Sequence, residues 1–431
     1  MKLKLTYIVY SLLLLTVIGC KKKDYRMNGT YMPYEYKKQS YTMPPEDYEP
    51  FYINYIGRHG SRYPVSNADI RYLKMVLLDA EKKSSISNKG KELILQLERI
   101  EKDCNGKWGN LSILGENQLR EIAHRMIANY PDLFKEHLYV QSDLSERCVK
   151  SMGAFMDEFY KIVPKSQISI DLLPEDNPVL NFFDVNLAYI DYKNKGEWRE
   201  LYHHYADSVL QNDRPVRSLF VGQYADTMSN KVHFMHALYS TYAILPNTDI
   251  PITLQDYLTG EELYSLWSVE NVRQYLEKGP TPLSKGLSVN ISFPLLEDFL
   301  STSYNAITEG GVSADFRFAH AETIIPFAAL LGIPLASDKE TNLNLINTKW
   351  LDFQVSPMAA NIQWIFYSND TGNYLVKMLL NEKEVRFPIE TETPPYYDWE
   401  DIRNYYQKVL ESLPIIPSFS VERQVRYYKE P

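Results

Sequence analysis

A short run of aromatic and β-branched residues constrains this chain most, because it passes without a break into a cationic loop. Residues 51–56, Phe-Tyr-Ile-Asn-Tyr-Ile, predict a buried strand. The loop that follows is Gly57-Arg58-His59-Gly60-Ser61-Arg62-Tyr63-Pro64. A glycine at position 60 permits close approach of the backbone to a ligand, and a proline at position 64 stiffens the exit. The fold must therefore present two arginines and a histidine at the end of a core strand.

The residue types in this loop suit phosphoryl transfer. A planar guanidinium binds two phosphate oxygens at once, and a neutral imidazole can attack phosphorus at ordinary pH. Taken alone, Arg58-His59-Gly60 is also compatible with a surface loop of chance composition. The placement of Arg62 and Pro64 in register after a predicted strand favours a phosphate-binding site.

Two further predicted strands also end in polar residues. Residues 137–142 form the first, and Arg147 lies beyond it at the start of a helix predicted to reach residue 159. Residues 313–319 form the second, followed by His320-Ala321-Glu322 and a helix to residue 331. Because ligands of α/β sheets bind at the carboxyl ends of the strands, we expect these side chains to converge with the loop. Taken alone, His320 and Glu322 also fit an ordinary helix start, and Arg147 a surface helix position.

The remaining patterns predict an α/β fold interrupted by a helical lobe. Periodic apolar residues predict helices at 68–81, 89–100, 117–129 and near 399–413, and a β-hairpin at 361–367 and 374–380. Between residues 164 and 287 no strand pattern is convincing, and Thr259 and Glu262 form a capping box for a helix through residue 276. We therefore expect a mixed, mainly parallel sheet flanked by helices, with an inserted, mainly α-helical lobe.

The N-terminus predicts a targeting segment. Lys2 and Lys4 precede an apolar stretch from Leu5 to Ile18, which is too short for a comfortable membrane span. It ends in Val-Ile-Gly-Cys, which resembles the lipobox of a bacterial lipoprotein with Cys20 as the site of acylation. We expect a lipid-anchored protein of the bacterial cell envelope, on the outer membrane, at its periplasmic face or at the cell surface. The alternative is an uncleaved anchor with an incidental cysteine.

These patterns divide the chain into successive parts. They are a signal peptide (1–19), a tether (20–45), a first part of the α/β domain (46–163), a helical insertion domain (164–290) and a second part of the α/β domain (291–431). The 431 residues are enough for a large core.

The net charge of the chain limits the kinds of partner that it can bind. A formal charge of −9 argues against nucleic acid as a partner, because no domain-wide basic field is available.

Cys104 and Cys148 are either a disulfide or a pair of buried thiols. The pairs His203-His204 and His233/His236 suggest a zinc site only weakly, since no carboxylate completes a metal motif, and helix-surface or partly buried histidines are favoured.

The residues at the three strand ends together resemble those of clade-2 histidine phosphatases, the histidine acid phosphatase and phytase family. The family signature Arg-His-Gly-x-Arg-x-Pro is matched by residues 58–64 without a substitution. Arg147, followed by Ser151 and Phe155, is similar to a second family feature. The distal motif of the family is commonly His-Asp, whereas His320-Ala321-Glu322 looks like the multiple inositol polyphosphate phosphatases. The resemblance covers residue 50 to the C-terminus, but the insertion matches only in general character.

The resemblance implies a phosphoglycerate-mutase-like fold and a role for each residue. His59 would form a phosphohistidine, and Glu322 would protonate the leaving oxygen and then activate water. The phosphoryl oxygens would be held by Arg58, Arg62, Arg147 and His320. No cofactor or metal is implied.

The expected substrate is an inositol polyphosphate, with phytate as the leading candidate. A broad-specificity acid phosphatase or sugar-phosphatase, and a nutrient-binding surface lipoprotein without turnover, are the alternatives. Basic residues of the lobe are candidates for contacts to a polyphosphorylated ring, although solvated surface positions are favoured for them: Lys193, Lys195, Arg199, Arg214 and Arg217.

Overall fold

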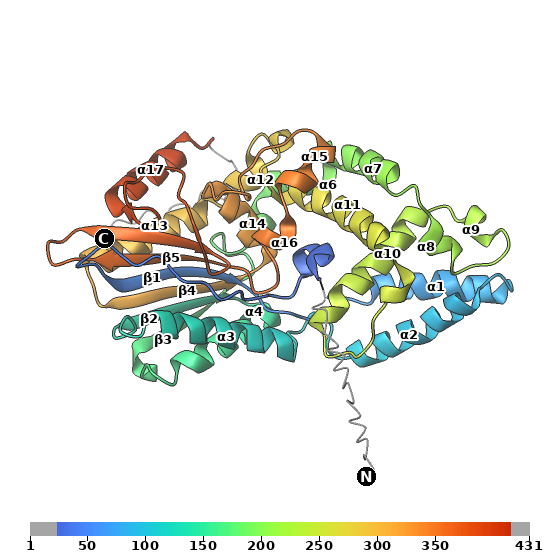
Figure 1. Ribbon diagram of the computed structural model, residues 1–431, viewed down its shortest axis with the longest axis horizontal. Coiled ribbons are helices and arrows are strands. Elements are labelled where there is room, and N and C mark those ends of the chain that lie inside the picture. The colour runs from blue at the N-terminus through green and yellow to red at the C-terminus, as the bar shows by residue number, and fades with distance from the viewer. Residues whose placement is uncertain (1–23, 415–431) are drawn as a thin grey trace, which may run out of the picture.

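The computed structural model describes residues 24–414, and its elements are shown in Figure 1. The predicted signal peptide, Cys20 and the first residues of the predicted tether lie outside the described residues. Within residues 24–414, no helix combines the length and hydropathy that a membrane span requires.

The strands are β1 (Glu49–Arg58), β2 (His137–Asp143), β3 (Ile168–Leu173), β4 (Val312–Ala319), β5 (Asn361–Ser368), β6 (Tyr374–Leu380), β7 (Lys383–Val385) and β8 (Tyr397–Asp398). The α-helices are α1 (Ala68–Lys82), α2 (Asn88–Cys104), α3 (Ile113–Asn129), α4 (Glu146–Phe159), α5 (Phe182–Val185), α6 (Leu187–Lys195), α7 (Trp198–Val209), α8 (Arg214–Arg217), α9 (Tyr224–Thr227), α10 (Lys231–Ile244), α11 (Gly260–Lys278), α12 (Leu287–Asn290), α13 (Phe293–Thr308), α14 (Ala321–Leu330), α15 (Leu343–Lys349), α16 (Asp352–Val355) and α17 (Trp399–Ser412). Short 3₁₀ helices are η1 (Arg26–Tyr31), η2 (Lys165–Gln167), η3 (Leu245–Asn247), η4 (Gln255–Tyr257) and η5 (Pro282–Ser284).

The strands form one mixed sheet in the order β3-β2-β4-β1-β5-β6-β7, with β8 paired to β6. Neighbours among β1, β2, β3 and β4 are parallel, whereas β5, β6, β7 and β8 pair antiparallel. The carboxyl ends of β1, β2 and β4 therefore meet at one edge, where open α/β sheets bind their ligands. The predicted fold class and hairpin are confirmed.

Helices cover both faces of this sheet, as β1 illustrates. Ile53 and Tyr55 point into the core beneath α3 and α4, where the rings of Tyr55 and Phe155 lie 5.2 Å apart. Tyr52 and Ile56 point to the opposite core, beneath α13 and α14. Figure 1 shows the resulting layers, with α13 and α17 on one side of the strands and α3 and α4 on the other. This burial on both faces explains the nearly continuous apolar character of the strand.

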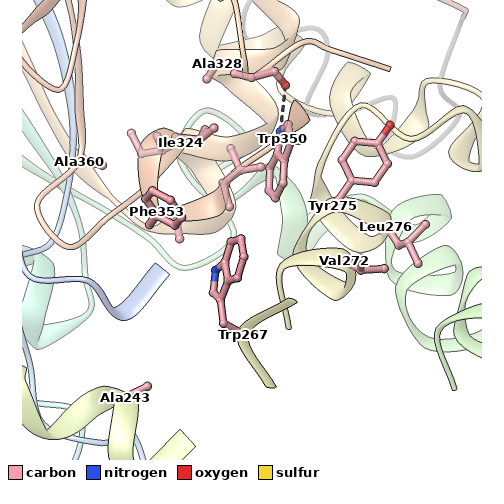
Figure 2. Close-up of a cluster of buried hydrophobic side chains, with 14 of the residues drawn as sticks. Ala243, Trp267, Val272, Tyr275, Leu276, Ile324, Ala328, Trp350, Phe353 and Ala360 are labelled. Carbon is pink, nitrogen blue, oxygen red and sulfur yellow. Dashed lines mark hydrogen bonds between the residues drawn. The ribbon is translucent and has the colours of Figure 1, made fainter. Parts of the chain in front are cut away.

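The helical lobe joins the α/β part through α11. The helix begins at the predicted capping box, since the Thr259 hydroxyl accepts from the Glu262 N–H and the Glu262 carboxylate accepts from the Thr259 N–H. Figure 2 shows Trp267 and Tyr275 of α11 gathered with Ile324 of α14 and with residues that precede β5. This packing fixes the last turn of α11 against the first turn of α14.

One strand within the predicted insertion was missed. Ile168, Ile170 and Leu172 alternate with polar residues, which is a strand pattern, but the run is short and lies between two prolines. It forms the edge strand β3, parallel to β2, and most of it is exposed. The prediction of no strand between residues 164 and 287 is therefore wrong. The first part of the α/β domain continues to residue 173, where β3 ends.

The lobe also recruits helices from the predicted first part of the α/β domain. The helix α1 contacts α10, and the Ser87 N–H before α2 donates to the Leu219 carbonyl over 3.0 Å. Figure 1 shows α1 and α2 beside α8 and α10, away from the sheet. Residues 68–104 therefore belong spatially with the inserted segment.

Residues 24–45 do not form the predicted tether. Asn28, Gly29 and Thr30 of η1 are buried, and the Asn28 amide donates to the Ala243 carbonyl over 2.8 Å. Further along, the Tyr34 hydroxyl donates to the Glu382 carboxylate over 2.8 Å. The polar, tyrosine-rich composition that suggested a linker instead supplies hydrogen bonds along the surface of the body.

The two cysteines of the described residues are free and buried, which excludes the disulfide and confirms the alternative of buried thiols. Burial raises the pKa of Cys104 to about 11, so this thiol stays protonated at neutral pH.

A pair of glycines sets the distance between the loop after β1 and the first turn of α3. A Cβ on Gly60 would lie 2.5 Å from the Gly115 carbonyl oxygen, and a Cβ on Gly115 would collide with the Ser61 carbonyl. We expect Gly115→Ala to lower the free energy of unfolding by about 1–3 kcal/mol, the usual cost of overpacking. Urea denaturation measures this change. Gly153→Ala on the exposed face of α4, where a Cβ meets nothing within 4 Å, is the matched control and should be neutral or stabilising. Equal stability of both variants would contradict the role of the glycine contact.

Candidate active site

The three predicted strand ends meet. Arg58, the last residue of β1, lies in register with Ala319, the last residue of β4, and the His59 N–H donates to the Ala319 carbonyl over 3.0 Å. The ring centroids of His59 and His320 are 5.6 Å apart, and Arg147 Nη2 lies 3.2 Å from His320 Nδ1. The structure thus brings together the six residues predicted for catalysis and phosphate binding, which include Arg62 and Glu322.

The His59 imidazole is arranged as a neutral nucleophile. Its Nδ1 lies 2.9 Å from the Gly60 carbonyl oxygen, and because a carbonyl can only accept, Nδ1 carries the proton. The ring is 3% exposed, and burial lowers its pKa well below the ordinary value, helped by the charges of Arg58 and Arg62. The lone pair on Nε2 is therefore available over a wide pH range.

Three arginines and His320 form a cationic cluster around this ring. Arg58 is held by its Nη1, which donates to the carbonyls of Thr30 and Ser356 over 2.7 Å each, and Arg62 Nη1 donates to the Tyr63 carbonyl over 2.9 Å. Among the described residues, the buried Nε–H groups of Arg58, Arg62 and Arg147 have no acceptor. Buried donors of this kind are costly unless an anion accepts from them, so the cationic cluster suits phosphoryl oxygens.

A neighbouring carboxylate, which the sequence motifs did not identify, stabilises the protonated form of His320. Its Nε2 donates to the Asp143 carboxylate over 3.0 Å. Burial alone would lower the pKa of His320, but its hydrogen bond to the Asp143 carboxylate keeps the pKa above the ordinary value. The resulting imidazolium faces the Arg147 guanidinium, and two cationic donors at this distance repel unless an anion binds both. In the sequence, Asp143 is indicated as a site residue by its position at the polar end of the strand that became β2.

Glu322 lies in the first turn of α14 and pairs with a second residue that the sequence did not suggest. Lys278 Nζ is 2.8 Å from Glu322 Oε1, and Lys278 is only 4% exposed. Burial would raise the pKa of Glu322, but the Lys278 charge and hydrogen bond hold it well below the ordinary value. Lys278 ends α11 in the inserted lobe, and no sequence motif connects it to the strand ends.

A cleft of about 530 Å³ opens beside His320 and Arg147. Its walls come from the ends of β2 and β3 and from α5, and its lining residues are Asp143, Ser145, Arg147, Glu175, Asp176, Asn181, Asp184, Val185 and His320. The lining thus combines the basic groups of Arg147 and His320 with the carboxylates of Asp143, Glu175, Asp176 and Asp184.

The basic residues predicted in the lobe do not join the cationic cluster. Arg214 pairs with Glu262, and Arg217 with Asp213 and Asp226, on α8 at the far side of the lobe from the strand ends (Figure 1). Lys195 pairs with Asp191 on the same helix, and Arg199 covers the Trp198 ring. Lys193 is the member of this group whose charge reaches the cleft, where it lowers the pKa of Asp184 against the larger effect of burial.

Asn381 and Glu382, in the turn between β6 and β7, interact with other parts of the body than the cationic cluster. The Glu382 carboxylate pairs with Arg125 of α3 over 2.8 Å. Glu382 also accepts hydrogen bonds from the Tyr34 and Tyr41 hydroxyls, so it ties the N-terminal segment to the turn between β6 and β7.

One group of residues within 24–414 could hold a metal ion. Ligand atoms of Asp143, Cys148 and His320 lie within 4.8 Å of one another. These atoms are already engaged, since the Cys148 thiol donates to the Ala319 carbonyl and His320 donates to Asp143. His203, His204, His233 and His236 belong to no such group in the described part of the chain.

Comparisons with known proteins agree with this geometry. The family model of the histidine phosphatase superfamily (branch 2) matches residues 52–381. Human multiple inositol polyphosphate phosphatase 1 is 23% identical over 337 residues, covering 70% of this chain and 67% of the relative.

Two solved structures share the fold. The multiple inositol polyphosphate phosphatase of Bifidobacterium longum, in complex with inositol hexasulfate, has a TM-score of 0.75 at 21% identity, covering 86% of this chain and 96% of that one. The phytase from D. castellii has a TM-score of 0.69 at 16% identity, covering 90% and 85%.

The electrostatics of His59 lead to a pH prediction for Arg147→Met. His59 acts only when neutral, and nearby cations lower its pKa, so activity should persist well below pH ~6.5 and fall only when His59 is protonated. Removing the Arg147 charge raises the pKa of His59, and the acid limb of kcat/KM moves to higher pH. We also expect a loss of about 10²–10³ in kcat/KM from the missing phosphate donor.

Arg147→Lys is the matched control, because it keeps the charge but not the planar fork. Its acid limb should stay near that of the wild type while kcat/KM still falls. An unmoved limb in Arg147→Met would contradict the electrostatic account.

Proposed function

The chain belongs to the histidine phosphatase superfamily (branch 2), and on that premise we propose that it hydrolyses inositol polyphosphates through a phosphohistidine at His59. The observation that carries the proposal is the buried, neutral His59 ring, whose unprotonated Nε2 is surrounded by the cationic cluster. This arrangement supports a phosphomonoesterase that uses an enzyme nucleophile.

In the first half-reaction, the Nε2 lone pair of His59 forms a bond to phosphorus while the bond to the leaving oxygen breaks. The arginines and His320 stabilise the charge on the equatorial oxygens. Glu322 supplies a proton to the leaving oxygen, because an unprotonated alkoxide of an inositol ring is a poor leaving group.

In the second half-reaction, Glu322 accepts a proton from water, whose oxygen attacks phosphorus. The P–N bond then breaks and His59 regains its lone pair. The ester and one water molecule have become an alcohol and inorganic phosphate, and the groups of the protein have returned to their starting state.

The substrate class rests on two lines of support. The relatives named multiple inositol polyphosphate phosphatase and the phytase are similar to this chain over most of its length. An anionic substrate also suits a net-acidic protein that gathers three arginines and His320 around His59, because this cluster focuses a positive field on the bound phosphoryl group.

Phosphate release from phytate in the presence of a chelator tests this function. We expect the wild type to release phosphate and, after an alkaline quench that preserves the acid-labile P–N bond, to give a radiolabelled phosphoprotein with ³²P substrate. His59→Ala should lower turnover by about 10⁴-fold or more and abolish the label, as loss of a nucleophile does. His124→Ala, on the exposed surface of α3, is the control and should keep both.

Failure on phytate with activity on simple monoesters would replace the substrate assignment with that of a broad acid phosphatase. Tight binding of inositol hexasulfate without turnover of any monoester would favour a binding lipoprotein.

We also propose that Cys20 is acylated and anchors the protein in a bacterial envelope, because the preceding residues Val17-Ile18-Gly19 resemble a lipobox. Cys20→Ser should abolish labelling by radioactive palmitate in a bacterial host and move the protein from the membrane to the soluble fraction. Cys104→Ser should leave both unchanged. Equal labelling of wild type and Cys20→Ser would overturn the anchor.

A further inference from the structure

Lys278 is buried, charged and directed at the catalytic acid. Its Nζ donates to Glu322 Oε1 over 2.8 Å and to Gln274 Oε1 over 3.0 Å, and lies 3.9 Å from Glu277 Oε1. Burying an ammonium group is unfavourable unless its charge is compensated, so a lysine at this depth needs partners of this kind. Glu322 is the more exposed member of the pair, with its side chain 32% exposed against 6% for Lys278.

The position of Lys278 is set by rigid packing. Leu276 and Tyr275, which precede it in α11, pack in the core shared with Ile324 and Ala328 of α14 (Figure 2). The last turn of α11 and the first turn of α14 are therefore fixed relative to each other. Two hydrogen bonds and the longer ion pair with Glu277 hold the flexible Lys278 side chain in place.

We propose that Lys278 is a positioning residue that binds Glu322 by Oε1 and thereby directs Oε2, with its proton, at the leaving oxygen. This inference rests on the proposed function. In the first half-reaction, the proton passes from Oε2 to the bridging oxygen as the P–O bond breaks and the bond from His59 Nε2 to phosphorus forms. Lys278 then stabilises the carboxylate that results, until water returns a proton to Oε2.

The charges around the pair explain why Glu322 can gain its proton when substrate binds. The Glu322 carboxyl interacts with Lys278 of α11, His320 before α14, Arg58 at the end of β1, Arg62 in the following loop, Asp184 of α5 and Tyr189 of α6. Glu277 acts on the Lys278 ammonium instead. A phosphoryl dianion bound by the arginines and His320 would neutralise part of this positive charge, so the pKa of Glu322 would rise towards its ordinary value and the carboxyl could take up a proton. Lys278 is not one of these phosphate-binding groups. Lys278 therefore remains the cation that sets the acid strength of Glu322 in the complex.

Lys278→Met tests the proposal with two substrates whose leaving groups differ in their need for a proton. β-Glycerophosphate has an alkoxide leaving group that needs a proton, whereas p-nitrophenyl phosphate does not. On the acid plateau, we expect kcat for β-glycerophosphate to fall about 10- to 100-fold, within the range of general acid catalysis, and kcat for p-nitrophenyl phosphate to change less than about threefold. KM should change little for either substrate.

The pH profile adds a readout that a purely structural role would not move. Lys278 lowers the pKa of Glu322, and the first step needs protonated Glu322. Losing the charge raises that pKa, so the alkaline limb of kcat/KM for β-glycerophosphate should move to higher pH. Lys278→Arg keeps the charge and should restore the position of the limb and most of kcat. Glu322→Gln should lose more on β-glycerophosphate than Lys278→Met and should abolish the limb.

Equal losses on both substrates, or an unmoved alkaline limb, would overturn the role of Lys278. Far-ultraviolet circular dichroism and thermal unfolding of each variant separate this result from misfolding, and Lys278→Arg remains decisive if Lys278→Met does not fold. Failure of the wild type on every monoester would instead overturn the proposed function.

Discussion

The burial of positive charge at the carboxyl ends of the parallel strands is the constraint on which this structure depends. Arg58 and Arg62 are 3% and 8% exposed, and a guanidinium at this depth must be compensated by fixed dipoles or anions. Carbonyl oxygens of Thr30, Ser356 and Tyr63 supply part of the compensation, and the Asp143 carboxylate supplies it for His320. The same field keeps His59 neutral, so the charges that bind a phosphoryl group also prepare its nucleophile.

Segments far apart in the sequence are needed to maintain this arrangement. The sheet supplies the convergence of strand ends, η1 and the residues before β5 supply carbonyls, and α11 brings Lys278 to Glu322. The aromatic core between α11 and α14 therefore stabilises the fold and also holds Lys278 close to Glu322 (Figure 2). A change in that core would act on the proton donor through the distance between two helix ends.

The sequence was most informative where one local pattern determined both structure and chemistry. The strand ending at Arg58, the helix starting near Arg147 and the junction at His320 follow from hydrophobic periodicity and from polar residues at element ends, and the fold class followed from them. The role of Lys278 could not be predicted, because its contact with Glu322 depends on tertiary packing that brings two helix ends together. The residues 24–45 were misinterpreted because polar composition does not distinguish a free linker from a segment whose side chains bond to the body.

The contact of η1 with Arg58 has a practical consequence for recombinant production. A truncation chosen from sequence would begin near residue 46, after the polar segment, and would leave the β1 strand and the whole signature loop intact. It would nevertheless remove the Thr30 carbonyl that holds the Arg58 guanidinium, and it would remove the packing of η1 against α10 and α16. The boundary of the functional unit therefore lies before the 3₁₀ helix, upstream of the point where the recognisable family sequence starts.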